Sequence, residues 1–179
     1  NNAANFTVGA NLMMVAMMAY QQEWDELNQA THIFQQTSMR IRYSAIPVVI
    51  ATQGYVFGGG CEFSMHADAV VAAAESYIGL VEVGVGIIPG GGGTKEFAVR
   101  LSDEMAKEGD VQIPRLIEKF KTIATAQVAT SADEAFGIGY LLPQKDSIVR
   151  NTARNISEAK KKVLELAYDY VKPIQRKDI

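Results

Sequence analysis

The most informative segment of the chain reads Ile46-Pro47-Val48-Val49-Ile50-Ala51-Thr52-Gln53-Gly54-Tyr55-Val56-Phe57-Gly58-Gly59-Gly60-Cys61-Glu62-Phe63-Ser64-Met65-His66-Ala67-Asp68. Pro47 marks the start of a strand, and the apolar run 48–51 is typical of a buried strand. The glycines at 58–60 allow a tight backbone turn into residues 61–66, which we predict to be a short helix closed by Asp68.

The residues that follow Asp68 predict two further buried strands. Residues 69–74 are apolar and read as a second strand, and Tyr77-Ile78-Gly79 reads as a third, shorter one. We predict a loop over residues 81–86, because its glycines break either regular period. Residues 89–93 form a second glycine loop, and a helix is expected from about Thr94.

The flanks are predicted to be helical. Met13, Met14, Met17 and Met18 form two pairs at a spacing of four, and the next helix has one apolar stripe that we expect to be buried: Trp24, Leu27, Thr31, Phe34, Ser38 and Ile41. Ser131-Ala132-Asp133-Glu134 is a capping-box sequence, and Gly137 or Gly139 can end its helix. A last amphipathic stripe comprises Ile156, Ala159, Val163, Leu166 and Tyr170. This order of elements favours an α/β fold.

The composition excludes several classes of protein. Of the 179 residues, 48% are hydrophobic and 21% charged, which argues against extensive disorder, and a net charge of −3 offers no basic surface for nucleic acid. The longest apolar stretch, residues 12–20, is shorter than the roughly 20 residues that span a bilayer. One cysteine, Cys61, fits a reducing compartment, so we expect a cytoplasmic protein. The chain begins at Asn1 without an initiator Met, and we expect it to be part of a longer polypeptide.

The averages hide an uneven distribution of charge. Eleven of the 15 glycines lie between Gly54 and Gly93, and no Lys or Arg occurs between Arg42 and Lys95. That stretch nevertheless carries four acids: Glu62, Asp68, Glu75 and Glu82. A carboxylate there has little chance of a local cationic partner, so we expect the catalytic groups in this stretch.

Two of these acids are candidates for proton transfer. Glu62 would lie in the first turn of a helix, where unpaired N–H groups and the helix dipole favour an ionised carboxylate, and the glycine turn can hold an oxyanion. Glu82 has apolar neighbours, and desolvation without a cation would raise its pKa. Two carboxyls with separated pKa values form a base and an acid. The ordinary alternative, that Glu62 merely begins a helix and Glu82 is a solvated loop residue, stays open on spacing alone.

The other motifs give weaker evidence of function. The loop Pro89-Gly90-Gly91-Gly92-Gly93-Thr94-Lys95 lacks the order of a phosphate-binding Walker motif, and no dinucleotide fingerprint occurs. Cys61 and His66 would point in different directions on a short helix, which favours a structural thiol over a nucleophile–base pair. His32 and His66 lack metal-ligand spacing, so we predict no metal site. The methionines either line a pocket for a flexible apolar chain or pack in the core.

Together these residues resemble the crotonase family, the enoyl-CoA hydratase/isomerase superfamily. The resemblance covers about fifty residues in ordered motifs: Ile46-Pro47-Val48-Val49-Ile50-Ala51, residues 54–62, His66-Ala67-Asp68, residues 79–90 and Gly92-Gly93-Thr94. Tyr77, the glycine run at 90–93 and Lys95-Glu96-Phe97 are most similar to the hydratase part of bacterial fused β-oxidation proteins. In those proteins a 3-hydroxyacyl-CoA dehydrogenase portion precedes the hydratase in the same chain.

The resemblance implies a crotonase-like (ClpP/crotonase) α/β spiral of ββα units with covering helices. Residues 1–179 would form a single, partial, N-terminally truncated domain, with an active-site core over 1–100 and a mostly helical part over 101–179. Only eight residues precede Gly9 here, whereas the family's domain begins earlier. The substrate would be an acyl-CoA, and this segment would need no cofactor of its own, since NAD would belong to the dehydrogenase portion upstream. The family's last helices, which often help close the site or build a homo-oligomer, are expected to be missing after Ile179.

The resemblance also implies roles for single residues. The catalytic glutamates map onto Glu62 and Glu82, and the oxyanion-hole N–H groups onto Ala10 and Gly59. Glu62 would activate water for attack at C3 and Glu82 would protonate C2, giving syn hydration of trans-2-enoyl-CoA. The expected substrate-binding residues are Met13, Met14, Met17, Gly58, Gly60, Pro89 and Gly90. Asn11 replaces the family's usual Asp, with little effect expected on the N–H of Ala10.

Two alternatives remain open at this point. The first is an isomerase of 3-enoyl-CoA to 2-enoyl-CoA, for which family members can manage with the carboxylate at the Glu82 position. The second is a non-catalytic acyl-CoA-binding or assembly module, which is motivated by the short segment before Gly9.

Overall fold

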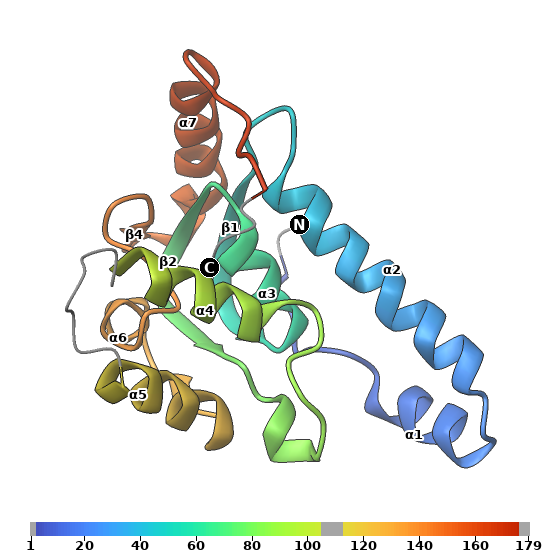
Figure 1. The fold of residues 1–179 in the computed structure, drawn as a ribbon. Coiled ribbons are helices and arrows are strands. Elements are labelled where there is room, and N and C mark those ends of the chain that lie inside the picture. The colour runs from blue at the N-terminus through green and yellow to red at the C-terminus, as the bar shows by residue number, and fades with distance from the viewer. Residues whose placement is uncertain (1–2, 105–112, 176–179) are drawn as a thin grey trace.

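A small, mainly parallel sheet lies at the centre of the computed structural model, which describes residues 3–104 and 113–175 (Figure 1). Its strands are β1 (Val49–Phe57), β2 (Ala69–Gly79), β3 (Val128–Ala129) and β4 (Ser147–Val149). Strands β1 and β4 both pair parallel to β2, and β3 pairs antiparallel to its last residues. Strand β2 is therefore the inner strand, which explains why it begins with an unbroken buried apolar run rather than an alternating pattern.

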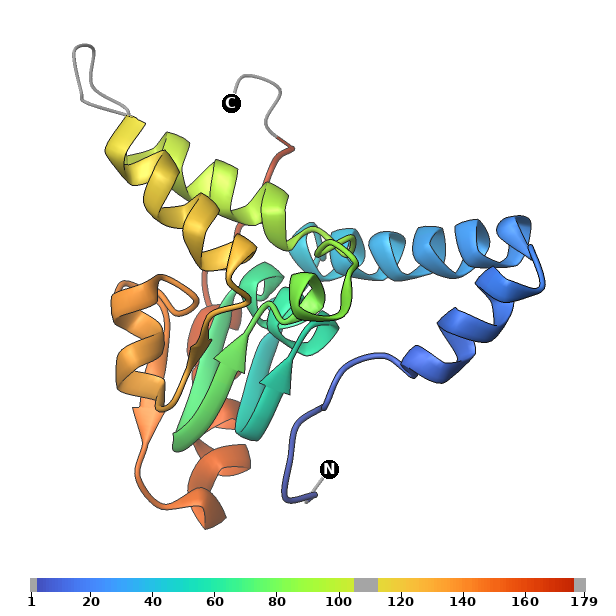
Figure 2. The ribbon, with the colours of Figure 1, turned by 90° about the horizontal axis from the view of Figure 1, so that it is seen from below.

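Helices cover this sheet and extend beyond it. They are α1 (Leu12–Tyr20), α2 (Trp24–Arg42), α3 (Gly59–His66), η1 (Glu82–Val85, a 3-10 helix), α4 (Gly93–Glu104), α5 (Ile113–Ala124), α6 (Ala132–Ile138), η2 (Thr152–Arg154, a 3-10 helix) and α7 (Asn155–Ala167). Helices α3 and α7 both pack on β1 and β2, α6 packs on β2, and α4 packs on α3. Helix α1 and the first half of α2 form an arm that stands away from the body (Figure 2).

The core lies between the sheet and helices α3, α4 and α6. Its largest fully buried side chains include Met65 of α3, Phe97 of α4 and Tyr140 after α6. Phe97 and Tyr140 contact each other with ring centroids 5.6 Å apart. No helix within the described ranges is both long and apolar enough to span a membrane.

The structure confirms the predicted order of strand, helix and strand but moves several boundaries. The strand predicted at 48–51 continues through β1, because Gly54 has a positive φ of 58° and forms a bulge instead of ending the strand. Tyr77-Ile78-Gly79 is the end of β2 and not a separate strand. The loop predicted at 81–86 contains η1, which Gly86 ends in the left-handed conformation at a φ of 83°.

The apolar stripe of α2 was predicted to be buried, and this is wrong for most of its length. Trp24 is 60% exposed, and Ser38 is the only residue of α2 that is fully buried. The reason is that the first half of α2 belongs to the arm, while only its second half reaches α3, where Phe34 stacks on Phe63 at 4.7 Å between ring centroids. In α7 likewise only Ala159 of the predicted stripe is fully buried.

Two predicted helix ends are confirmed. The Ser131 hydroxyl accepts a hydrogen bond from the N–H of Glu134 at 3.1 Å, as a capping box requires, and Gly139 ends α6 with a φ of 95°. The Met-rich segment is helical as predicted, and the side chain of Asn11 caps it by accepting from the N–H of Met14 at 3.2 Å. Asn11 therefore does at this position what an Asp side chain would also do.

Candidate active site

The N-terminal segment runs along β1 and ends beside the glycine turn. Thr7 pairs parallel to Val56, and its N–H donates to the C=O of Tyr55 at 2.9 Å. A Cβ added to Gly58 would lie 3.9 Å from the Cα of Gly9, so the backbone of Gly9 and Ala10 reaches the carboxyl end of β1. This end of a parallel strand is where α/β proteins place their ligands.

The glycines after β1 are required by close packing. Gly58 has a φ of 55° and a ψ of −122°, and helix α3 begins at the next residue. A Cβ at Gly60 would collide with the side chain of Thr7, so only glycine lets α3 begin against the N-terminal segment. Gly59 is the first residue of α3, where a backbone N–H has no acceptor within its own helix.

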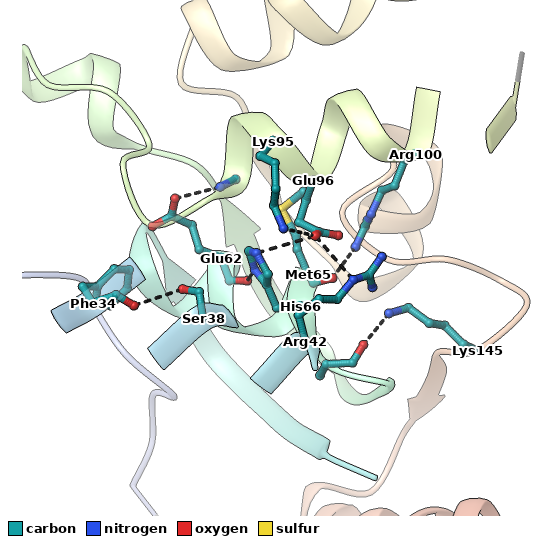
Figure 3. Close-up of polar contacts among 12 residues, drawn as sticks. Phe34, Ser38, Arg42, Glu62, Met65, His66, Lys95, Glu96, Arg100 and Lys145 are labelled. Carbon is teal, nitrogen blue, oxygen red and sulfur yellow. Dashed lines mark hydrogen bonds and ion pairs between the residues drawn. The ribbon is translucent and has the colours of Figure 1, made fainter. Parts of the chain in front are cut away.

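Glu62 lies in the first turn of α3 and is 2% exposed. Its Oε1 accepts a hydrogen bond from the N–H of Gly93 at 2.9 Å, which links it to the start of α4 (Figure 3). Burial raises the pKa of Glu62, and the N–H groups of Gly93, Gly91 and Gly92 partly oppose that rise. The helix start was expected to keep this pKa low, and desolvation outweighs it.

Glu82 is the first residue of η1 and is 8% exposed. Burial, with a smaller contribution from the negative charge of Glu62, raises the pKa of Glu82 to about 7. Its Oε1 lies 3.3 Å from the position that a Cβ on Gly58 would take, and its buried Oε2 has no hydrogen-bond partner among the described residues. Glu82 is therefore a carboxyl that can hold a proton near neutral pH and lies directly beside the glycine turn.

The predicted substrate-binding residues differ in exposure, and their contact with substrate stays a prediction. Gly58, Gly60 and Pro89 are buried around the turn, and the C=O of Gly90 accepts from Nε2 of Gln35 at 2.8 Å, which ties the second glycine loop to α2. The predicted acyl-contacting side chains of α1 are instead mostly exposed: Met13 by 71%, Met14 by 58% and Met17 by 53%.

The remaining sequence candidates have structural roles. Cys61 is fully buried, and burial raises the pKa of its thiol, which leaves it a poor nucleophile. Within residues 3–104 and 113–175, no group of three or more His, Cys, Asp or Glu side chains could hold a metal ion. The Nδ1 of His66 makes a 2.6 Å hydrogen bond to the C=O of Glu62, and burial lowers the pKa of His66 to about 4, so the ring is neutral.

The sequence predictions missed a polar cluster around the buried Glu96, which we call the Glu96 cluster and define as Arg42, His66, Lys95 and Glu96 (Figure 3). Burial disfavours the charge on Glu96, but the cations Arg42 and Lys95 lower its pKa below the usual value. The spacing of four residues between Glu62 and His66 could have shown their hydrogen bond. Nothing in the sequence showed that Arg42 comes near Glu96.

Comparisons with known proteins agree with this geometry. Residues 4–113 match the family described as enoyl-CoA hydratase/isomerase. A probable 3-hydroxyacyl-CoA dehydrogenase of Bacillus subtilis is 40% identical over 169 residues, which are 94% of this chain and 21% of that protein. Crotonyl-CoA hydratase of Syntrophomonas wolfei is 40% identical over 93 residues, which are 52% of this chain and 30% of that protein.

A solved structure shows the same fold. The crystal structure of an enoyl-CoA hydratase from Polaromonas sp. JS666 superimposes with a TM-score of 0.70 at 21% identity, covering 92% of this chain and 56% of that one. The predicted crotonase-like α/β fold is thus confirmed, although the chain spans only part of the length of the relatives it matches. By the match of its sequence over residues 4–113, the chain belongs to the enoyl-CoA hydratase/isomerase family.

Proposed function

We propose that this chain carries the active site for the reversible syn hydration of trans-2-enoyl-CoA to 3-hydroxyacyl-CoA in fatty-acid β-oxidation. The observation that carries the proposal is the pair of buried carboxyls, Glu62 on the helix that begins after Gly58 and Glu82 beside Gly58 itself. Burial raises the pKa of both, as proton transfer near neutral pH requires. The family match and the hydratase relative support the same reaction.

The backbone beside the turn would bind the thioester. Its C=O would accept hydrogen bonds from the N–H groups of Ala10 and Gly59, which the N-terminal segment and the start of α3 bring to the carboxyl end of β1. Negative charge that develops on the thioester oxygen would then be stabilised as an enolate.

The two carboxyls would divide the proton transfers. Ionised Glu62 takes a proton from water as the water oxygen bonds to C3, and protonated Glu82 gives its proton to C2 of the enolate. The product gains the elements of one water molecule, and a proton passed from Glu62 to Glu82 through solvent restores both groups. The reverse sequence dehydrates the 3-hydroxyacyl thioester.

A second candidate reaction is isomerisation of 3-enoyl-CoA to 2-enoyl-CoA. The pKa of Glu82, about 7, favours it as a secondary activity, because one carboxyl of that kind can remove a proton from C2 and return it to C4.

The test is the hydration of crotonyl-CoA by the intact polypeptide that carries these residues. Glu62→Gln and Glu82→Gln should each lower kcat by about 10² to 10⁴-fold, while Glu75→Gln, on an exposed position of β2, serves as the matched control. Full activity in the double variant would contradict the mechanism. If no hydration occurs and only Glu82→Gln abolishes 3-enoyl-CoA isomerisation, the isomerase is the better description; binding of acyl-CoA without turnover would indicate a non-catalytic module.

We propose further that a 3-hydroxyacyl-CoA dehydrogenase portion precedes this segment in a cytoplasmic polypeptide, and that the chain assembles with copies of itself. The Bacillus subtilis relative supports the first point, since its name is that of a dehydrogenase and this chain matches only 21% of its length. The segment itself would use no cofactor apart from the coenzyme A of its substrate, and NAD would serve the dehydrogenase portion. Production of NADH from crotonyl-CoA by the intact polypeptide tests the fusion, and sedimentation tests the assembly.

A further inference from the structure

The Glu96 cluster lies directly behind the proposed base. Glu96 is fully buried, and its Oε1 lies 2.6 Å from Nζ of Lys95, 3.6 Å from Nε of Arg42 and 3.6 Å from Nε2 of His66. These partners come from α2, α3 and α4, so one carboxylate holds three helices together at a single point (Figure 3). Because His66 is neutral, the charges that Glu96 balances are those of Arg42 and Lys95, and removal of the Glu96 carboxylate would leave both cations without this partner.

Two short connections join this cluster to Glu62. Through α3, the Nδ1 of His66 contacts the C=O of Glu62 at 2.6 Å. Through α4, the N–H of Glu96 donates to the C=O of Gly92 at 2.9 Å, and the next residue, Gly93, donates its N–H to the Glu62 carboxylate. These contacts, together with the chain that joins them, form a closed ring with the Glu96 cluster on one side and the Glu62 carboxylate on the other.

The glycine loop packs tightly inside that ring. A Cβ on Gly92 would lie 2.8 Å from Cε1 and 2.9 Å from Nε2 of His66, so the loop rests on the imidazole ring. Any movement of His66 or of the start of α4 would therefore move the N–H groups that face Glu62.

We infer that Glu96 is a positioning residue for Glu62: its carboxylate fixes the first turn of α4 to Arg42 of α2, and that turn holds the N–H of Gly93 against the Glu62 carboxylate. This inference rests on the proposed function, because it assigns Glu96 to the support of the proposed base. Glu96 touches no substrate in this arrangement and acts only through its neighbours.

The test is the pH profile of crotonyl-CoA hydration by Glu96→Gln in the intact polypeptide. The N–H groups of the loop lower the pKa of Glu62, so loosening them should raise that pKa. The acidic limb of kcat/KM should then move to higher pH by about half a unit, and kcat should fall by about tenfold to a hundredfold with KM little changed. The charged or titratable groups around Glu62 and the cluster are Cys61, His66, Glu82, Lys95, Glu96, Arg42, Arg100 and Lys145.

Arg42→Gln provides a second route if Glu96→Gln folds poorly. Gln keeps a polar side chain at this position of α2, but it loses the ion pair with Glu96. Its acidic limb should move in the same direction, and the double variant should show less than the sum of the two shifts because both break one connection.

Asp146→Asn is the matched control. Asp146 is another buried carboxylate, and it accepts from the N–H groups of Val70 and Leu142 at 2.7 Å each, away from Glu62. It should lower thermal stability and leave the pH profile in place. An unmoved acidic limb in both Glu96→Gln and Arg42→Gln would overturn the inference, even with kcat reduced. Full activity of Glu62→Gln would instead overturn the proposed function, so the two failures are distinguishable.

Discussion

At the scale of single residues, Glu82 combines burial with an oxygen that no described residue hydrogen-bonds. Such a group is costly to ionise, and burial accordingly raises its pKa from 4.5 to about 7. The pKa of Glu82 is higher in the folded state than in the unfolded state. Its contribution to the free energy of unfolding is therefore fully present below pH 4.5 and is lost as the pH rises through 7. The proposed acid is thus a source of instability at alkaline pH.

Glu82→Gln should therefore stabilise the protein at pH 8 while it removes activity. We expect a gain of about 3 kcal/mol in the free energy of unfolding at pH 8, since the uncharged amide escapes the cost of ionisation. The gain should shrink to near zero by pH 4.5. Urea unfolding at both pH values measures it, and Glu75→Gln at an exposed position should give no such pH-dependent difference. Equal gains at both pH values would contradict the raised pKa.

The sequence predicted both acids at this scale because their stretch contains no Lys or Arg. Glu96 could not be found in the same way. Its two flexible partners, Arg42 and Lys95, are the very cations that border that stretch, and only the packing of α2 on α3 brings Arg42 to α4. A pattern of missing charges shows where a carboxylate lacks neighbours, but it does not show where the distant charges meet.

At the scale of elements, the second glycine loop is held between α2 and α3. Gly91 is buried, and a Cβ there would collide with the ring of Phe34 and with Oε2 of Glu62. The loop can therefore approach the carboxylate only while this position has no side chain.

Gly91→Ala should lower the rate of crotonyl-CoA hydration by about a hundredfold, because it displaces Glu62 or the loop that faces it. Gly137→Ala in α6 is the control, since a Cβ there has nothing within 4 Å. The control should keep full activity and gain about 0.5–1 kcal/mol in the free energy of unfolding. Circular dichroism should show both variants folded; wild-type rates for Gly91→Ala would contradict the tight packing.

Secondary structure was predicted best where local chemistry decides it. The Ser131 cap, the end of α6 at Gly139 and the helix after Gly58 all depend on nearby residues. The burial of α2 depends on what lies opposite the helix, which periodicity does not contain. The 3-10 helix η1 was missed because its glycines argue against any regular element, whereas Gly86 in fact supplies its C-terminal cap.

At the scale of the whole molecule, the last helix is tied to the first strand. Asn155, at the start of α7, is 2% exposed, and its Nδ2 donates to the C=O of Thr52 in β1 at 2.8 Å. Further along the chain, the Tyr170 hydroxyl lies 3.2 Å from both carboxylate oxygens of Asp68. Hydrogen bonds between segments about a hundred residues apart therefore hold the C-terminal part of the chain against its first strand and the segment before β2.

Asn155→Ala should lower the free energy of unfolding by about 1–3 kcal/mol, because the C=O of Thr52 loses the shorter of its two side-chain hydrogen bonds and keeps the longer one from the Ser76 hydroxyl. The midpoint of urea unfolding should fall with an unchanged slope, as expected for one cooperative unit. Ser157→Ala, an exposed position two residues on, should change stability by less than about 0.5 kcal/mol. A change confined to α7, with the midpoint unmoved, would show that this helix unfolds independently.

The position of α3 between two parallel strands has a consequence for motion at the site. Helix α3 is the crossover from β1 to β2, so both of its ends are attached to paired strands, and we expect the backbone that carries Glu62 to stay in place while the sheet is intact. Glu82 begins a one-turn helix whose following residues, 84–88, are exposed, so its fluctuations need no break in the sheet. An entering substrate would therefore meet a base, Glu62, that is held in place, and an acid, Glu82, whose position can fluctuate.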